Sequence, residues 1–152
     1  MAAISFTELR PQQGDHLQVL LSKLADQRRT RDGTALASAA RTTLTNSAVF
    51  TNHDCRLAIV TLNITAASGT GGLAVLLYGR SALSADAQLN AAAAATTATG
   101  TFTWIFGPAA ALNLFSGVKQ CVSAPVPRSF FLSVTVGDAS SYTYSLDYCL
   151  IP

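Results

Sequence analysis

The sequence predicts an all-β protein: an antiparallel β-sandwich of jelly-roll-like form, preceded by an N-terminal arm that carries one short amphipathic helix. From Thr42 onward, short runs of alternating apolar and polar residues recur between clusters of Gly, Pro, Asn, Asp and Ser. Seven or eight such runs follow one another up to Pro152, a spacing that is typical of sandwiches and jelly rolls. Near the N-terminus, leucines instead repeat at the spacing of a helix.

The distribution of charge divides the chain into an arm, residues 1–41, and a sandwich domain, residues 42–152. Only 12% of the residues are charged, about half the roughly 25% that is usual in soluble domains. Residues 1–41 hold ten of the eighteen charges in the chain. A weakly charged body costs little to desolvate, which favours a surface that other subunits cover.

The arm is expected to form a helix over about residues 15–28, with Asp15 as its N-cap and Gln18 completing a capping box. Its apolar stripe consists of Leu17, Leu20, Leu21 and Leu24. The arginines that follow are Arg28, Arg29, Arg31 and Arg41. These eight are our candidate partner-binding residues. The arginines suit either a solvated linker or a basic arm on an acidic partner; spaced as they are, they give little support to nucleic-acid binding.

The β pattern begins with Thr42 to Phe50, and then Arg56 to Tyr78 is expected to form a hairpin. Side chains alternate along a strand, so Ala58, Val60, Leu62 and Ile64 should share one face, with Leu57 and Ile59 on the other. Both faces are apolar here, which places this strand inside the sandwich. Ala66 to Gly72 supplies the glycine-rich turn.

The middle of the chain has a less regular pattern. Gly79 to Gly100 fits a loop followed by a plain strand, Ala94 to Thr99, although Ser84 could also cap a short helix through Ala91–Ala95. Gly100 to Pro108 is a strand in which Phe102, Trp104 and Phe106 alternate with polar residues. No basic residues interleave with these rings, so we expect them in the core and not in a base-stacking platform.

The C-terminal part is expected to be a second hairpin. Phe130, Leu132, Val134 and Val136 alternate with polar or outward residues, Gly137 to Ser140 turns the chain, and a strand from Tyr142 to Leu150 follows. Before it, Val118 to Val122 fits a strand, and Pro125 and Pro127 favour an extended edge.

The residues give no indication of an enzyme, a metal site or a cofactor. Cys55, Cys121 and Cys149 are odd in number and lack paired spacing, so we expect reduced thiols. His53 next to Asp54 has no placed nucleophile, and adjacent residues in a turn are a common coincidence. We also expect no membrane span, because no apolar run approaches the ~20 residues required, and no secretory signal, because the first ten residues lack a basic start and an apolar core.

Three segments resemble a family of small virion-associated proteins of tailed bacteriophages. They are LAIVTLNITAASGT with LAVLLY after it, ATGTFTWIFGP, and VPRSFFLSVTVGDASSYTYSLDY, which together cover most of residues 56–150. The resemblance implies a capsid decoration (cement) protein that is made in the host cytoplasm and located on the capsid surface. Its partners would be the major capsid protein or other virion subunits, and it would form a homo-oligomer, a dimer or trimer, on the particle. The family's polar insertion after the second strand is replaced here by the Ala-rich Gly79 to Asn90.

Two alternatives stay open at this point. The first is a neck, tail or fibre-base component, which is also structural. The second is a carbohydrate-binding module, in which Trp104, Tyr142, Tyr144 and Tyr148 would stack on sugars. Their alternation along strands favours burial of these rings over such a role.

Overall fold

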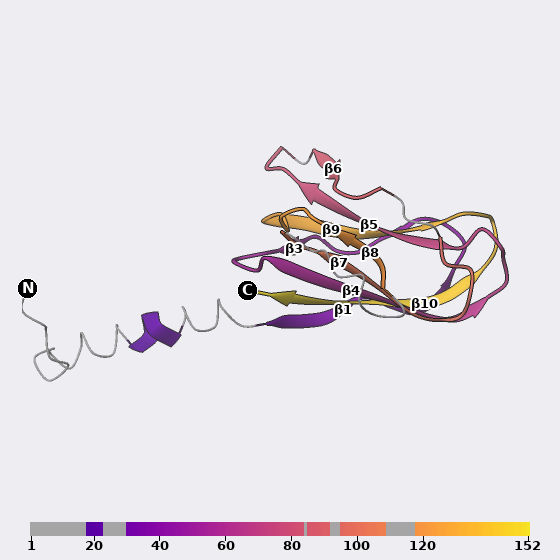
Figure 1. Cartoon of the computed structure of the whole chain (residues 1–152), viewed down its shortest axis with the longest axis horizontal. Helices are drawn as coiled ribbons and strands as arrows, with labels where there is room; N and C mark the ends of the chain where they lie inside the picture. Colours follow the sequence, from indigo (N-terminus) through magenta and orange to yellow (C-terminus); the bar gives the residue numbers. More distant parts are fainter. Residues whose placement is uncertain (1–17, 23–29, 84, 92–94, 109–117) are drawn as a thin grey trace, which may run out of the picture.

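The computed structural model describes residues 18–22, 30–83, 85–91, 95–108 and 118–152. Within these ranges the chain forms ten strands in two facing sheets (Figure 1). The predicted all-β sandwich with a short helix near the N-terminus is confirmed.

The first sheet has the strand order β1-β10-β4-β7-β8. Its strands are β1 (Arg31–Arg41), β4 (Leu57–Ala67), β7 (Gly100–Phe106), β8 (Val118–Val122) and β10 (Tyr142–Ile151). The second sheet has the order β2-β9-β5-β6, with β3 also paired to β9. Its strands are β2 (Thr45–Asn46), β3 (Phe50–Thr51), β5 (Leu73–Arg80), β6 (Asp86–Gln88) and β9 (Ser129–Val136). All pairs are antiparallel except β7 with β8.

The connectivity is that of a jelly roll. When β2 and β3 are taken together as one interrupted strand and β8 is set aside, eight strands remain. Numbered along the chain, they lie in the orders 1-8-3-6 and 2-7-4-5, the double Greek key that defines this fold. The strand β8 is an addition at the edge of the first sheet, parallel to β7.

The core lies between the two sheets and follows the predicted alternation. Along β4, Ala58, Val60, Leu62 and Ile64 are buried, whereas the residues between them are half-buried. They meet Leu73, Val75 and Leu77 of β5, and the large rings of Trp104, Phe106 and Phe130. The expected placement of Leu62 and Ile64 in the main core is confirmed, with both at most 2% exposed.

Both predicted hairpins are wrong, although their strands are present. The strand β4 pairs with β10 and β7, and β5 pairs with β9 and β6, so β4 and β5 lie in different sheets. The same holds for β9 and β10. Each turn therefore passes from one sheet to the other. Alternation defines the two faces of a strand but contains no information about its neighbour, and a turn of several residues is long enough to cross a sandwich.

The two crossing turns lie against each other and are hydrogen-bonded. Gly137 donates its N–H to the carbonyl of Gly72 (2.9 Å), and a Cβ on Gly71 would lie only 2.5 Å from the main-chain carbon of Gly137. Gly72 also has a φ of 73°, in the region that favours glycine. The contact therefore requires glycine on both sides.

The carboxylate of Asp138 closes this contact. Its Oδ2 accepts the N–H of Gly71 (2.7 Å) and of Thr70 (3.0 Å), and its Oδ1 accepts the N–H of Ser140 (3.0 Å). The buried hydroxyl of Tyr142 accepts the N–H of Gly72 (2.8 Å) and lies 3.3 Å from the same carboxylate. The amide of Gly71, assisted by those of Ser140 and Thr70, lowers the pKa of the Asp138 carboxyl.

The predicted boundary between arm and sandwich at residue 42 is wrong. Arg31–Arg41 forms β1, which pairs with β10 along its whole length, from Arg31 opposite Leu150 to Arg41 opposite Tyr142. Ala35 and Leu36 pack against the core. The prediction failed because this strand is made mostly of Ala, Ser, Gly and charged residues, which do not produce a clear alternation.

Two further segments differ in detail from the prediction. Thr42 to Phe50 contributes two short strands, β2 and β3, in place of one. In Gly79 to Gly100 the strand is β6, and the expected strand Ala94 to Thr99 is reduced to a single bridge between Thr96 and Leu73, with Ala94 outside the described residues. Asn90 links the two sheets at this side. Its side chain bonds the main chain of Val75 and Leu77 in β5 and the side chain of Gln120 in β8 (3.0 Å).

A truncation series tests the role of β1. A chain that begins at Thr30 keeps β1 and should melt as the full chain does. A chain that begins at Thr42 leaves β10 without its neighbour, so its melting temperature should fall by roughly 10 °C or more, since 1 kcal/mol corresponds to about 2–8 °C in domains of such size. Circular dichroism melting curves measure this, and equal melting of the two truncated chains would contradict the assignment of β1 to the domain.

Asp138→Asn should destabilise the protein at neutral pH and much less in acid. A carboxyl whose pKa is lowered by folding stabilises the folded state above its unfolded pKa, about 3.9, and this stabilisation disappears as pH falls through the folded value. The melting temperatures of wild type and variant should therefore converge below about pH 4. Asp86→Asn is the matched control, because the pKa of Asp86 is lowered by Arg80 in an ion pair that solvent still reaches, and such pairs contribute little. A pH-independent gap between wild type and Asp138→Asn would refute the proposed role of the carboxylate.

Candidate functional site

The described part of the arm is a short helical segment with exposed apolar residues. Residues 18–22 are helical, and Val19, Leu20 and Leu21 are 50–56% exposed. Of the predicted stripe, Leu20 and Leu21 thus lie in a helix, as expected. The candidate residues Leu17, Leu24, Arg28 and Arg29, and most of the predicted helix from 15 to 28, lie outside the described residues.

The two described arginines of the predicted basic cluster do not come together. Arg31 and Arg41 are the first and last residues of β1, which separates their Cα atoms by about 30 Å at the usual rise of a strand. Arg41 has a structural role: its guanidinium donates to the carbonyls of Ala37 (2.7 Å), Ala39 (3.2 Å) and Tyr144 (2.9 Å). It also lies 4.6 Å from the centre of the Tyr144 ring. Arg41 is therefore held within the domain, and its role in partner binding stays a prediction.

The outer face of the first sheet presents a surface of hydroxyl and amide groups, which we name the hydroxyl face. It extends over the three adjacent strands β10, β4 and β7. Its residues are Thr61, Asn63, Thr65, Thr101, Thr103, Thr143 and Ser145. All are half-buried or exposed. The register places Thr61 opposite Thr103, and Asn63 opposite both Thr101 and Ser145. Asp147, the register partner of Thr61, adds one charge beside them. A face with so few charges costs less to desolvate than a charged one, provided that the partner hydrogen-bonds its hydroxyl and amide groups.

A polar hollow of about 440 Å³ lies where β3 ends and β9 begins, and its floor is Asn52. The Asn52 side chain is buried, and both its nitrogen and its oxygen are hydrogen-bonded. Its Nδ2 donates to the carbonyls of Cys55 (2.8 Å) and Val126 (3.2 Å), and its Oδ1 accepts the N–H of Cys55 (2.8 Å). The main-chain N–H of Asn52 donates to the carbonyl of Arg128 (2.7 Å). These bonds join two segments that are far apart in the sequence, so the floor of the hollow is rigid.

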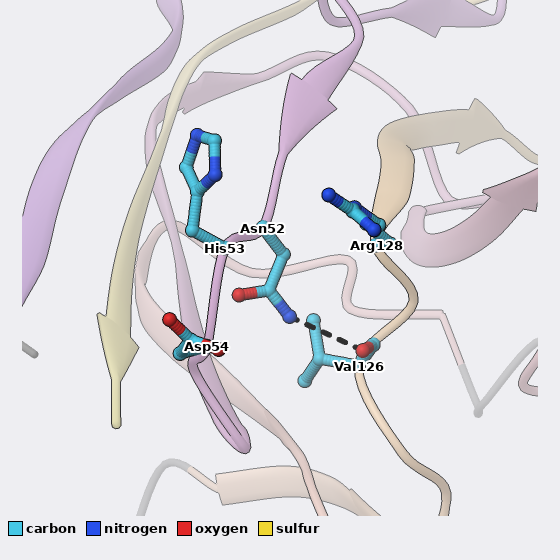
Figure 2. Close-up of a pocket in the computed structure, with 5 residues that line it drawn as sticks. All are labelled: Asn52, His53, Asp54, Val126 and Arg128. Carbon is cyan, nitrogen blue, oxygen red and sulfur yellow. Dashed lines mark hydrogen bonds between the residues drawn. The ribbon is translucent and has the colours of Figure 1, made fainter. Parts of the chain in front are cut away.

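The rim of this hollow consists of charged and polar side chains. His53, Asp54 and Arg128 all line the hollow. Figure 2 shows His53 and Asp54 on one side of Asn52 and Arg128 on the other. All three rim residues are exposed. The turn at Asn52-His53-Asp54 was expected, but the sequence did not show that Arg128 would lie beside it.

A second, smaller hollow of about 260 Å³ adjoins the first through Val126. It is lined by Cys55, Arg56, Pro108, Pro125 and Val126. Burial raises the pKa of the Cys55 thiol above its ordinary value, so this thiol is a poor nucleophile at neutral pH. Cys55, Cys121 and Cys149 form no disulfide, and no group of three or more His, Cys, Asp or Glu side chains suited to a metal ion occurs among the described residues.

The aromatic residues of the carbohydrate hypothesis do not form a binding platform. Trp104, Tyr142 and Tyr144 have no exposed surface, and Tyr148 packs on Phe50 with ring centres 4.7 Å apart. The expectation that these rings belong to the core is confirmed. No helix within the described part of the chain is long and apolar enough to cross a membrane.

Comparison with known proteins does not place this chain in a family. No family model, no curated protein and no solved structure matches it.

Arg41→Ala should destabilise the domain, whereas Arg31→Ala should not. The first change removes hydrogen bonds from a charged donor to three carbonyls, for which we expect a cost of about 1.5–3 kcal/mol in the free energy of unfolding. Arg31 makes no side-chain hydrogen bond in the described structure, so its replacement should change stability by less than about 0.5 kcal/mol. Urea denaturation of both variants measures the difference, and equal stabilities would show that the contacts of Arg41 are without effect.

Proposed function

We propose that this chain is a structural virion protein of a tailed bacteriophage, a decoration protein that binds the outside of the capsid and connects major capsid subunits. The mechanism would be mass action: a protein that binds only the assembled shell stabilises that shell in proportion to its excess over the dissociation constant. The resemblance of residues 56–150 to small virion proteins motivates the proposal, and the described surface of the molecule supports it.

The observation that carries the proposal is the unburied apolar segment of the arm. Val19, Leu20 and Leu21 are each about half exposed, although burial of a leucine side chain contributes roughly 1.5–3 kcal/mol. The chain then enters the sandwich as β1, in which eight of the eleven residues have partners in β10. The arm is therefore anchored to the folded domain through β1. A partner that buries the apolar side chains of the arm would in this way be attached to the domain.

The hydroxyl face supports the same role for the body. A sheet surface with threonines and an asparagine, and with few charges, costs less to cover than a charged one when the covering subunit hydrogen-bonds these groups. The low charge of the chain, 12% of residues, agrees with this. We expect the arm to provide apolar anchoring and the hydroxyl face to provide contact area.

The alternative location in the neck, tail or fibre base is distinguished by copy number. A shell-bound protein would be present in proportion to the many subunits of the capsid lattice, whereas a ring component would be present in the small number set by its rotational symmetry. Quantitative mass spectrometry of purified virions, with the major capsid protein as internal reference, measures this ratio. A low ratio would place the protein in the neck or tail, and absence from virions would refute the proposal.

The double variant Leu20→Asp, Leu21→Asp should bind particles much less than wild type. Loss of two buried leucines corresponds to at least roughly 3 kcal/mol, or about a hundredfold in affinity. Leu83→Asp is the matched control, because Leu83 is 92% exposed on the sandwich, outside the arm and the hydroxyl face. Cosedimentation with particles that lack the protein measures occupancy, and melting curves verify that both variants are folded. Full occupancy by the double variant would show that the arm is not the anchor.

A further inference from the structure

We propose that the hollow above Asn52 is a binding site for an oxyanion, a phosphate or a carboxylate group, with Arg128 and His53 as its ligands. The inference rests on the geometry of this hollow alone and is independent of a role in virions. It gives a function to two side chains that the fold does not use.

The first argument is that the fold holds the two candidate ligands in place. Asn52 N–H donates to the carbonyl of Arg128, and the Asn52 amide bonds both Cys55 and Val126. His53 follows Asn52 directly, and Arg128 precedes β9. The main chain of both residues is therefore fixed before a ligand arrives, which reduces the entropy lost on binding.

The second argument is that the side chains of His53 and Arg128 are unsatisfied. Neither makes a hydrogen bond or an ion pair with another described residue, whereas Arg80 pairs with Asp86 (2.8 Å) and Arg41 bonds three carbonyls. A guanidinium offers five N–H donors in a planar arrangement that matches the two oxygens of a carboxylate or phosphate. Both side chains line the same hollow, on the two sides of the segment that carries Asn52 (Figure 2), so a ligand that fills the hollow can contact both.

The third argument concerns size and the remaining charge. A volume of about 440 Å³ exceeds that of a free phosphate ion and lies in the range of sites for small organic molecules. The carboxylate of Asp54 also lines the hollow, on the same side of Asn52 as His53 (Figure 2), where it would accept hydrogen bonds from hydroxyl groups and repel a second anion. We therefore expect the oxyanion to be one group of a larger, hydroxyl-bearing molecule, such as a phosphorylated polyol or a sugar acid.

The test is an NMR titration of the full-length protein with three probes: inorganic phosphate, glycerol phosphate and glucuronate, each against sodium chloride at equal ionic strength. Saturable shifts of the amides of Asn52–Asp54 and of Arg128 are expected. Tighter binding of glycerol phosphate or glucuronate than of inorganic phosphate would identify the larger ligand and its acid group. No saturable shift at these amides with any probe would overturn the proposal.

Four variants separate specific binding from a general attraction of anions. Arg128→Gln and His53→Ala should each weaken binding, the former by roughly tenfold or more because a charge-assisted bidentate contact is lost. Asp54→Asn should bind more tightly, because a like charge is removed while the side-chain carbonyl can still accept a hydrogen bond from a hydroxyl group. Arg80→Gln is the matched control, because Arg80 lies outside the hollow and pairs with Asp86. This variant should bind as wild type does. Equal weakening by Arg80→Gln and Arg128→Gln would overturn the assignment, and the dispersion of the same spectra verifies folding.

Discussion

The contact between the two crossing turns, Gly71–Gly72 and Gly137–Asp138, is the constraint on which the rest of the sandwich depends. Each turn carries the chain from one sheet to the other, and a main-chain hydrogen bond with the Asp138 carboxylate keeps the two turns together. On one side of this contact β4 and β10 pair from Ala67 and Tyr142, and on the other β5 and β9 pair from Leu73 and Val136. The four central strands therefore have their register set at one point, and the outer strands are added to them.

How much of this fold could be predicted depended on what local pattern encodes. The alternation in Leu57–Ala67 and Tyr142–Ile151 identified strands, faces and core residues correctly. Burial of one face of a strand requires an apolar residue at every second position, and this pattern is visible in the sequence. The choice of partner strand produces no such pattern in the sequence, and both turns were therefore interpreted as hairpins. The strand β1 was missed for a different reason. Its residues are mostly small or charged and lie at a sheet edge, where few of them need to be apolar.

The candidate sites show the same division. Leu20 and Leu21 were identified from helical spacing, which is a local property, and they are exposed in a helical segment. Arg41 was grouped with the arm because charge was counted along the chain, whereas its partners Tyr144 and Ala37 belong to strands whose pairing was not known. Arg128 was not identified at all, since its proximity to His53 follows from the pairing of β3 with β9. The one available signal was Asn52 three residues before Cys55, a spacing that suits a side chain bonding its own turn.

The position of Arg41 has a consequence for how these molecules behave when crowded. The strand β1 is the outermost strand of its sheet, and the exposed hydrogen-bonding groups of such a strand can pair with the same strand of another molecule, which leads to fibres. The Arg41 guanidinium occupies the carbonyls of Ala37 and Ala39, and the register of β1 is irregular between Thr34 and Ala39. An incoming strand would meet a cation and a distorted backbone there in place of a regular row of acceptors. This part of the β1 edge is therefore poorly suited to pairing with a strand of another molecule.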